Sequence, residues 1–125
     1  TLDDQYLVYN TNPALSPDQM ILQLNGASPN TITFTLNEEL NVPDGTDIKN
    51  GFTVTSGTIA TAIYNSATKK VTMTSAGDPD WNTPPTVSYA RLTGLYTDLI
   101  GNQLQDITNH IVEQLSINMA GGDLA

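Results

Sequence analysis

The stretch Thr31–Leu40 limits most strongly what this chain can fold into. Its sequence, TITFTLNEEL, places Ile32, Phe34 and Leu36 on one face of an extended chain and threonines on the other. This alternation of period two, in β-branched and aromatic residues, is typical of a half-buried antiparallel strand. A helix would scatter the same apolar side chains around its axis. We therefore predict a strand here.

Other short apolar segments show a similar pattern and are separated by Gly, Pro and Asn residues. We predict further strands at 20–24, 52–55, 58–64, 70–74, 86–91 and 111–118. A loop or a single helical turn is expected at 103–108, before the closing strand. About seven to eight short strands with this spacing of turns predict an all-β fold, an antiparallel β-sandwich.

The domain boundaries follow from the same pattern. Residues 1–19 contain an apolar patch at Tyr6–Tyr9 between polar residues and prolines, and they are either an edge strand or a linker. Residues 20–119 form the predicted sandwich. Residues 120–125, with their two glycines, are a tail or a linker to a further module. Because Thr1 is not a translation start, we expect the chain to be part of a longer one.

The charge of the chain excludes some classes of partner. It has 4 basic and 13 acidic residues, which gives a net charge of −9. Nucleic acid is therefore excluded as an expected partner, because phosphate binding needs a basic surface. No apolar run approaches the ~20 residues that a membrane span requires, so no membrane insertion is expected. The chain has no cysteine, so disulfides and thiolate metal sites are excluded as well.

Several weak motifs follow one another in an order that resembles the bacterial Ig-like repeats of large secreted and cell-surface proteins. Leu36–Asn41 ends the first strand, Asn50–Val54 and Lys70–Thr74 follow, then Pro85–Tyr89, and Asp98–Asp106 (DLIGNQLQD) comes last. The resemblance covers roughly 20–118. The chain departs from that family in having Leu36-Asn37 where an aromatic residue usually precedes the glutamate.

The resemblance implies an Ig-like β-sandwich that acts as a non-catalytic spacer or adhesion module of an extracellular or cell-surface protein. Its partners would be neighbouring domains of the same chain, together with a polysaccharide or another cell-surface ligand. Some modules of this kind are stiffened by calcium, and some accompany enzymes that act on polysaccharides. A carbohydrate-binding module is therefore the alternative function.

Residues for catalysis are scarce. His110 is the only histidine, and without cysteine a Cys–His pair is impossible. No pair of histidines or cysteines has the spacing of metal ligands. Ser88 or Ser116 could be joined to His110 only by guesswork. We therefore do not expect an enzyme.

Acidic loops make calcium the better chemical hypothesis, because this cation prefers carboxylate, amide and carbonyl oxygens presented by loops. Asp98, Asn102 and Asp106 lie in one glycine-containing loop, and Asp44 and Asp47 lie in another. The competing interpretation is that these side chains only hydrogen-bond to the local backbone of turns, as Asp and Asn commonly do.

Trp81, the only tryptophan, lies in a polar loop between Asp78, Asp80 and Asn82. An exposed indole flanked by such groups could stack on a sugar ring and hydrogen-bond to its hydroxyls. Trp81, Asp78 and Asp80 are thus the candidate carbohydrate-binding residues. The competing interpretation is that Trp81 plugs one end of the core.

Overall fold

A computed structural model of the chain describes residues 12–14, 20–24, 29–77 and 79–114. Most of the predicted edge strand or linker at 1–19, namely 1–11 and 15–19, lies outside these residues, as do the tail at 120–125 and Asp78. Asn12–Ala14 adjoins the domain, because its backbone is hydrogen-bonded to Asn37 and Gln105. None of the helices in the described parts of the chain is long and apolar enough to cross a membrane.

Seven strands and one short helix make up the described fold, which confirms the all-β prediction. Their bounds are β1 Met20–Gln23, β2 Thr31–Thr35, β3 Phe52–Val54, β4 Ile59–Asn65, β5 Lys70–Ser75, β6 Thr86–Tyr89, α2 Arg91–Gly94 and β7 Ile107–Gln114.

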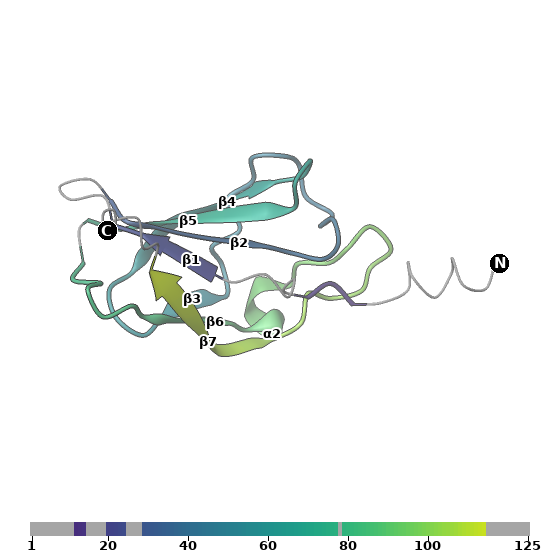
Figure 1. Cartoon of the computed structure of the whole chain (residues 1–125). Helices are drawn as coiled ribbons and strands as arrows, with labels where there is room; N and C mark the ends of the chain where they lie inside the picture. The colour runs from purple at the N-terminus through teal and green to yellow at the C-terminus, as the bar shows by residue number, and fades with distance from the viewer. Residues whose placement is uncertain (1–11, 15–19, 25–28, 78, 115–125) are drawn as a thin grey trace.

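All seven strands belong to one sheet in the order β3-β6-β7-β1-β2-β5-β4. The sheet is folded over, so that β1, β2, β5 and β4 face β7, β6 and β3 across the core (Figure 1). The two edges, β3 and β4, are joined by a short loop at 55–58, which leaves the sheet almost closed. One pair, β1 with β7, is parallel, so the sheet is mixed where a purely antiparallel one was predicted.

The strand order is that of the immunoglobulin fold. Lettered A to G along the chain, one layer reads D-E-B-A and the other G-F-C. Constant-type immunoglobulin domains pair their strands as A-B-E-D against C-F-G. The Ig-like architecture is therefore present in the topology as well as in the number of strands.

The alternation in the central strand is confirmed. Ile32 and Phe34 are buried and the threonines between them are partly exposed. Phe34 reaches across the core to Phe52 of the facing layer, with the ring centroids 5.7 Å apart. Val71 and Met73 of β5 are also buried, as predicted.

The last third of the chain differs from the prediction. Of the two alternatives predicted for 103–108, the structure has the loop, which ends where β7 starts at Ile107, earlier than the predicted residue 111. The helical turn lies instead at Arg91–Gly94. Asn109 has a positive φ of 46° at an irregularity in the pairing with β6, which shifts the alternation by one residue. Val112 is consequently buried and Ile111 is 71% exposed.

The short helix α2 packs against Tyr89. Any side chain at Gly94 would overlap the Tyr89 ring, and a side chain at Gly51, where φ is +93°, would come within 2.9 Å of the same ring. The Tyr89 ring also contacts Phe52, with the centroids 4.6 Å apart. Glycine is therefore required at both positions for the chain to turn so close to an aromatic side chain.

Tyr64 fixes the chain after β2. Its buried hydroxyl accepts a hydrogen bond of 2.9 Å from the backbone N–H of Leu40. Burial raises the pKa of the phenol above its usual 10.0, although the Leu40 hydrogen bond acts in the opposite direction. The neutral phenol therefore holds the bend between β2 and the loop that follows.

We expect Tyr64→Phe to lower the free energy of unfolding by about 1–3 kcal/mol, because the buried Leu40 N–H loses its acceptor. Urea denaturation followed by circular dichroism measures this change. Ile111→Ala, at an exposed position, is the control and should stay within about 0.5 kcal/mol of the parent. Equal stability of Tyr64→Phe and the parent would contradict this role of the hydroxyl.

Candidate functional site

The predicted acidic loop at 98–106 contains a tight turn built around Asp98. This carboxylate is buried, with 2% of its surface exposed. One oxygen accepts hydrogen bonds from the backbone N–H groups of Ile100 and Asn102, at 3.0 and 2.9 Å. The other accepts one from the Asn102 side-chain amide at 3.1 Å. Asp98 and Asn102 are therefore brought together as predicted, but they bind each other.

Glu38, from the loop after β2, also reaches this turn, where its carboxyl group lies beside that of Asp98 and donates a hydrogen bond to it only when Glu38 is protonated. Burial alone would raise the pKa of Asp98. The hydrogen bonds from the Asn102 and Ile100 groups, with a smaller contribution from Glu38, outweigh that effect and hold the pKa below the usual 3.8. The charged form of Asp98 is thus the form that the fold stabilises.

Asp106, the third residue of this predicted set, serves a different element. Its carboxylate accepts a hydrogen bond from the Arg91 backbone N–H at 2.8 Å, at the start of α2. It also lies 3.6 Å from the Arg91 guanidinium. Asp106 therefore fixes the helical turn.

The carboxylates of the second predicted acidic pair also accept hydrogen bonds from backbone N–H groups. Asp44 accepts a hydrogen bond from the Ser66 N–H at 2.9 Å. Asp47 accepts bonds from the N–H groups of Lys49 and Ala62, at 3.1 and 2.8 Å. Both side chains thus attach the loop before β3 to β4 and its turn.

These contacts favour the turn interpretation over a metal site. Within the residues that the structure describes, no three Asp, Glu or His side chains are gathered closely enough to hold a metal ion. The described aspartates are instead acceptors for backbone N–H groups, which is the common use of Asp in turns.

Trp81 does not provide a sugar-binding surface. Its side chain is 2% exposed, and its indole N–H donates a hydrogen bond of 3.0 Å to the Ser56 carbonyl. A ring that stacks on a pyranose needs an open face, and this ring has none. The prediction of Trp81 as a stacking residue is therefore wrong, because the indole closes one end of the core. Asp80 accepts a bond from the Asn82 N–H at 3.2 Å, as in a local turn.

No serine nucleophile is activated by histidine in the described residues. The Ser88 hydroxyl contacts Asn109, accepting a hydrogen bond from its backbone N–H at 2.9 Å. The ring nitrogen Nδ1 of His110 lies 2.9 Å from the carbonyl oxygen of its neighbour Ile111. This part of β7 therefore shows none of the geometry of a hydrolytic centre.

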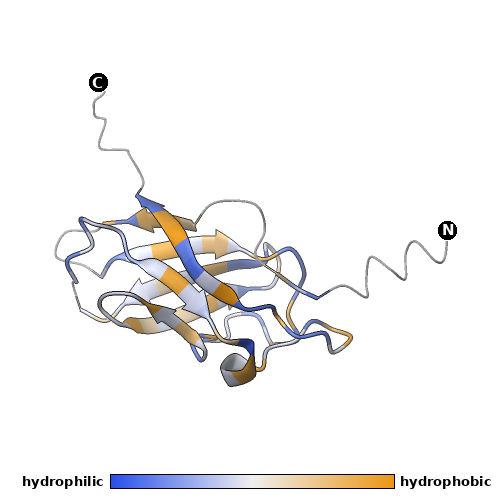
Figure 2. Ribbon diagram, turned by 90° about the horizontal axis from the view of Figure 1, so that it is seen from below, coloured by the Kyte–Doolittle hydropathy of each residue, from blue (hydrophilic) through white to orange (hydrophobic). Residues whose placement is uncertain are grey.

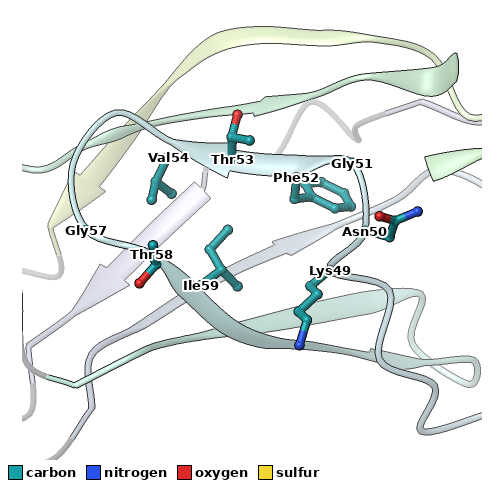
Figure 3. A pocket seen from close by; sticks show the side chains of 9 residues that line it. All are labelled: Lys49, Asn50, Gly51, Phe52, Thr53, Val54, Gly57, Thr58 and Ile59. Carbon is teal, nitrogen blue, oxygen red and sulfur yellow. The ribbon is translucent and has the colours of Figure 1, made fainter. Parts of the chain in front are cut away.

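A hollow of about 470 Å³ lies between β3 and β4. Figure 3 shows Phe52, Val54 and Ile59 on its walls and Lys49 extending toward β4. The Lys49 ammonium donates a hydrogen bond of 2.9 Å to the Ala60 carbonyl and lies 3.7 Å from Asp47. This hollow lies where the two edges of the sheet separate. The one charged residue in its lining, Lys49, already contacts Ala60 and Asp47.

The sequence analysis missed a group of exposed apolar residues in one stretch of the chain. Leu92, Leu95, Leu99 and Ile100 are between 56% and 71% exposed. Leu99 and Ile100 form the tip of a hairpin in which Thr97 pairs with Gln103. Two large apolar residues directly before Gly101, in a turn, were the signal that could have revealed this surface.

Comparison with protein-family models, with curated proteins and with solved structures finds no match to this chain. Its function must therefore be inferred from its own geometry.

We expect Asp98→Asn to lower the free energy of unfolding at neutral pH by about 1–3 kcal/mol, since the new amide N–H₂ would face the Asn102 amide donor. Because the folded state lowers the pKa of Asp98, its contribution is present above about pH 3.8 and is lost as the pH falls further. Chemical denaturation at several pH values should show the two proteins converging in acid.

The matched control for that experiment is Asp80→Asn, which alters an exposed aspartate with a single turn contact. Its effect should remain within about 0.5 kcal/mol at every pH. A constant difference between Asp98→Asn and the parent across the acid range would contradict the proposed role of the charge.

We expect thermal unfolding curves in EDTA and in millimolar Ca²⁺ to coincide, because the described aspartates already accept backbone hydrogen bonds. A ligand that bound only the folded state would add about 2.7 kcal/mol at a hundredfold excess over its Kd. A rise of several degrees in calcium, abolished by Asp98→Asn, would instead establish a calcium site at this turn.

Proposed function

We propose that this domain is a non-catalytic spacer or adhesion module of a bacterial extracellular or cell-surface protein. The observation that carries the proposal is the placement of the first and last strands. β1 and β7 are neighbours in the sheet and run parallel, with Met20 opposite Val112 and Leu22 opposite Gln114.

This pairing puts the two ends of the described chain at opposite ends of the domain. Ala14 is bonded to Asn37, which follows β2, so the chain arrives at the end where β1 begins. β7 then runs beside β1 and leaves at the other end, after Gln114. Figure 1 shows the same arrangement, with the chain spanning the long axis of the domain. Modules joined through these ends would extend in a line.

The same pairing suits a domain that carries tension. A pull on the two ends draws β1 and β7 in opposite directions along their length. All the hydrogen bonds of the ladder then resist together, because they lie across the direction of sliding. If two strands were instead pulled apart from the same end, their hydrogen bonds would break one after another. The arrangement therefore supports a mechanical role for the module.

The rest of the described surface is compatible with this role. The candidate chemical groups are engaged in turns, and the net charge of −9 keeps copies of an acidic domain apart in solution. The Ig-like topology agrees with the resemblance to bacterial surface repeats, although a fold alone does not assign a function.

Glu113→Pro should lower the force needed to unfold the domain when it is pulled through its two ends. Proline removes a backbone donor from β7 opposite Ile21, within the loaded pair. Single-molecule force spectroscopy on the full chain, placed between reference domains, measures the rupture force of each variant.

Met73→Ala is the matched control, because it removes a buried side chain from β5, outside the loaded pair. Both variants should lose about 2–5 kcal/mol of equilibrium stability, and only Glu113→Pro should lose most of the rupture force. A low rupture force for the parent, or equal losses of force for the two variants, would refute the load-bearing role.

A further inference from the structure

Exposed apolar side chains are concentrated in one stretch of the chain. Among the described residues, the large hydrophobic side chains that are exposed are Ile63, Leu92, Leu95, Leu99, Ile100 and Ile111. All but the first and last lie in the stretch 91–100, in α2 and the hairpin that follows. Scattered exposed leucines need no explanation, but a group of them commonly marks an interaction surface.

A hollow of about 400 Å³ adjoins the tip of this hairpin. It is lined by Asp98, Leu99 and Ile100 of the hairpin, by Asn37, Glu38 and Glu39 of the loop after β2, and by Lys69. Asp98 holds the tip in place through its bonds to the Ile100 and Asn102 N–H groups. The hollow is therefore formed by a fixed turn.

The chain arrives beside this hollow. The Ala14 N–H donates to the Asn37 side chain at 2.9 Å, and the Ala14 carbonyl accepts from the Asn37 N–H at 3.0 Å. The Pro13 carbonyl accepts from the Gln105 N–H at 3.0 Å. Figures 1 and 2 both place the start of the described chain next to the 97–103 hairpin.

We propose that this hollow is the docking site for residues Tyr6–Tyr9 of the same chain, which precede the described part. Tyr-Leu-Val-Tyr is the longest apolar run before Asn12. Its residues lie three to six positions before Asn12, and an extended chain of that length reaches about 10–20 Å. The covalent link gives such a segment a high effective concentration at the hollow.

The charges favour this occupant over a second copy of the protein. Each copy carries a net charge of −9, and the hollow is lined by three acidic side chains against one lysine, so two such ends would repel each other. The run Tyr6–Tyr9 carries no charge, and a phenol group of this run can donate a hydrogen bond to the carboxylate of Glu39. Leu7 and Val8 provide apolar side chains that can cover the exposed side chains of Leu99 and Ile100.

Docking would make the joint before this domain stiff. A free linker lets neighbouring modules rotate, whereas a linker packed on the domain fixes the direction from which the chain arrives. This consequence rests on the proposed spacer function. The docking itself does not, and it can be tested on the single domain.

Because the chain has no cysteine, a disulfide can report on the contact. The test variant carries Val8→Cys and Leu99→Cys, and the control carries Val8→Cys and Ile111→Cys. Leu99 and Ile111 are both exposed apolar positions, at 61% and 71%, but Ile111 lies on β7. Under mild oxidation at low protein concentration, we expect the intramolecular disulfide to form at least about tenfold faster in the test variant. Mass spectrometry of the quenched samples measures both rates.

Two results would overturn the proposal. Equal rates in the two variants would show that the segment does not prefer the hollow. A disulfide-linked dimer whose formation rises with protein concentration would show that a second copy occupies it.

A second measurement leaves the hollow unaltered. In NMR spectra, the double variant Leu7→Asp, Val8→Asp should shift the amide signals of Leu99, Ile100 and Glu38 and leave those of Phe52–Val54 in place, because the added charges would face carboxylates. Unchanged signals at the hairpin would also refute the docking. Neither result depends on the rupture force, so the docking and the spacer function can fail separately.

Discussion

The parallel pairing of β1 with β7 is the contact on which the rest of the structure depends. Without it, β4-β5-β2-β1 and β7-β6-β3 would be separate sheets, joined by the side chains between them and by a few loop contacts such as the bridge between Leu40 and Asp98. With it, a single sheet folds over on itself, and Met20, Leu22 and Val112 become buried along the fold. The pairing also joins two segments that are about as far apart in sequence as the domain allows. Such contacts are costly in loop entropy until the intervening strands are in place.

The local part of this fold could be predicted from the sequence, because each strand carries its own signal. Alternation in 31–35 and in 70–75 identified which side chains are buried, and the turn residues between 65 and 70 identified the hairpin. What could not be predicted was the closing strand. There Asn109 adopts a left-handed conformation, with φ 46°, and the alternation changes phase within the strand. A pattern with a fixed period of two cannot reveal a bulge, so it does not predict that Val112 is buried while Ile111 is exposed.

The candidate site was predicted less well, and for a physical reason. Asp and Asn in loops are used both to bind cations and to hold turns, and the residue types are the same in the two cases. The distinction depends on whether the oxygens converge on one point or turn back to their own backbone. At Asp98 they turn back, toward Ile100 and Asn102, and at Asp106 the partner is Arg91. Trp81 is a similar case, because the polar residues around it in sequence do not indicate that its ring is buried.

The turn at Asp98 links the buried structure to the exposed surface. A carboxylate that accepts several hydrogen bonds stabilises a turn much more firmly than a neutral side chain would, especially where water is excluded. The fold places this carboxylate directly before Leu99 and Ile100, which project outward. A mobile tip would let these side chains collapse onto the domain, because that would reduce their contact with water. Holding them exposed requires a rigid turn beneath them, and a rigid, exposed apolar tip costs stability unless another segment covers it. This balance is the physical reason to look for a segment that covers the tip, and the chain that arrives at Asn37 passes beside it.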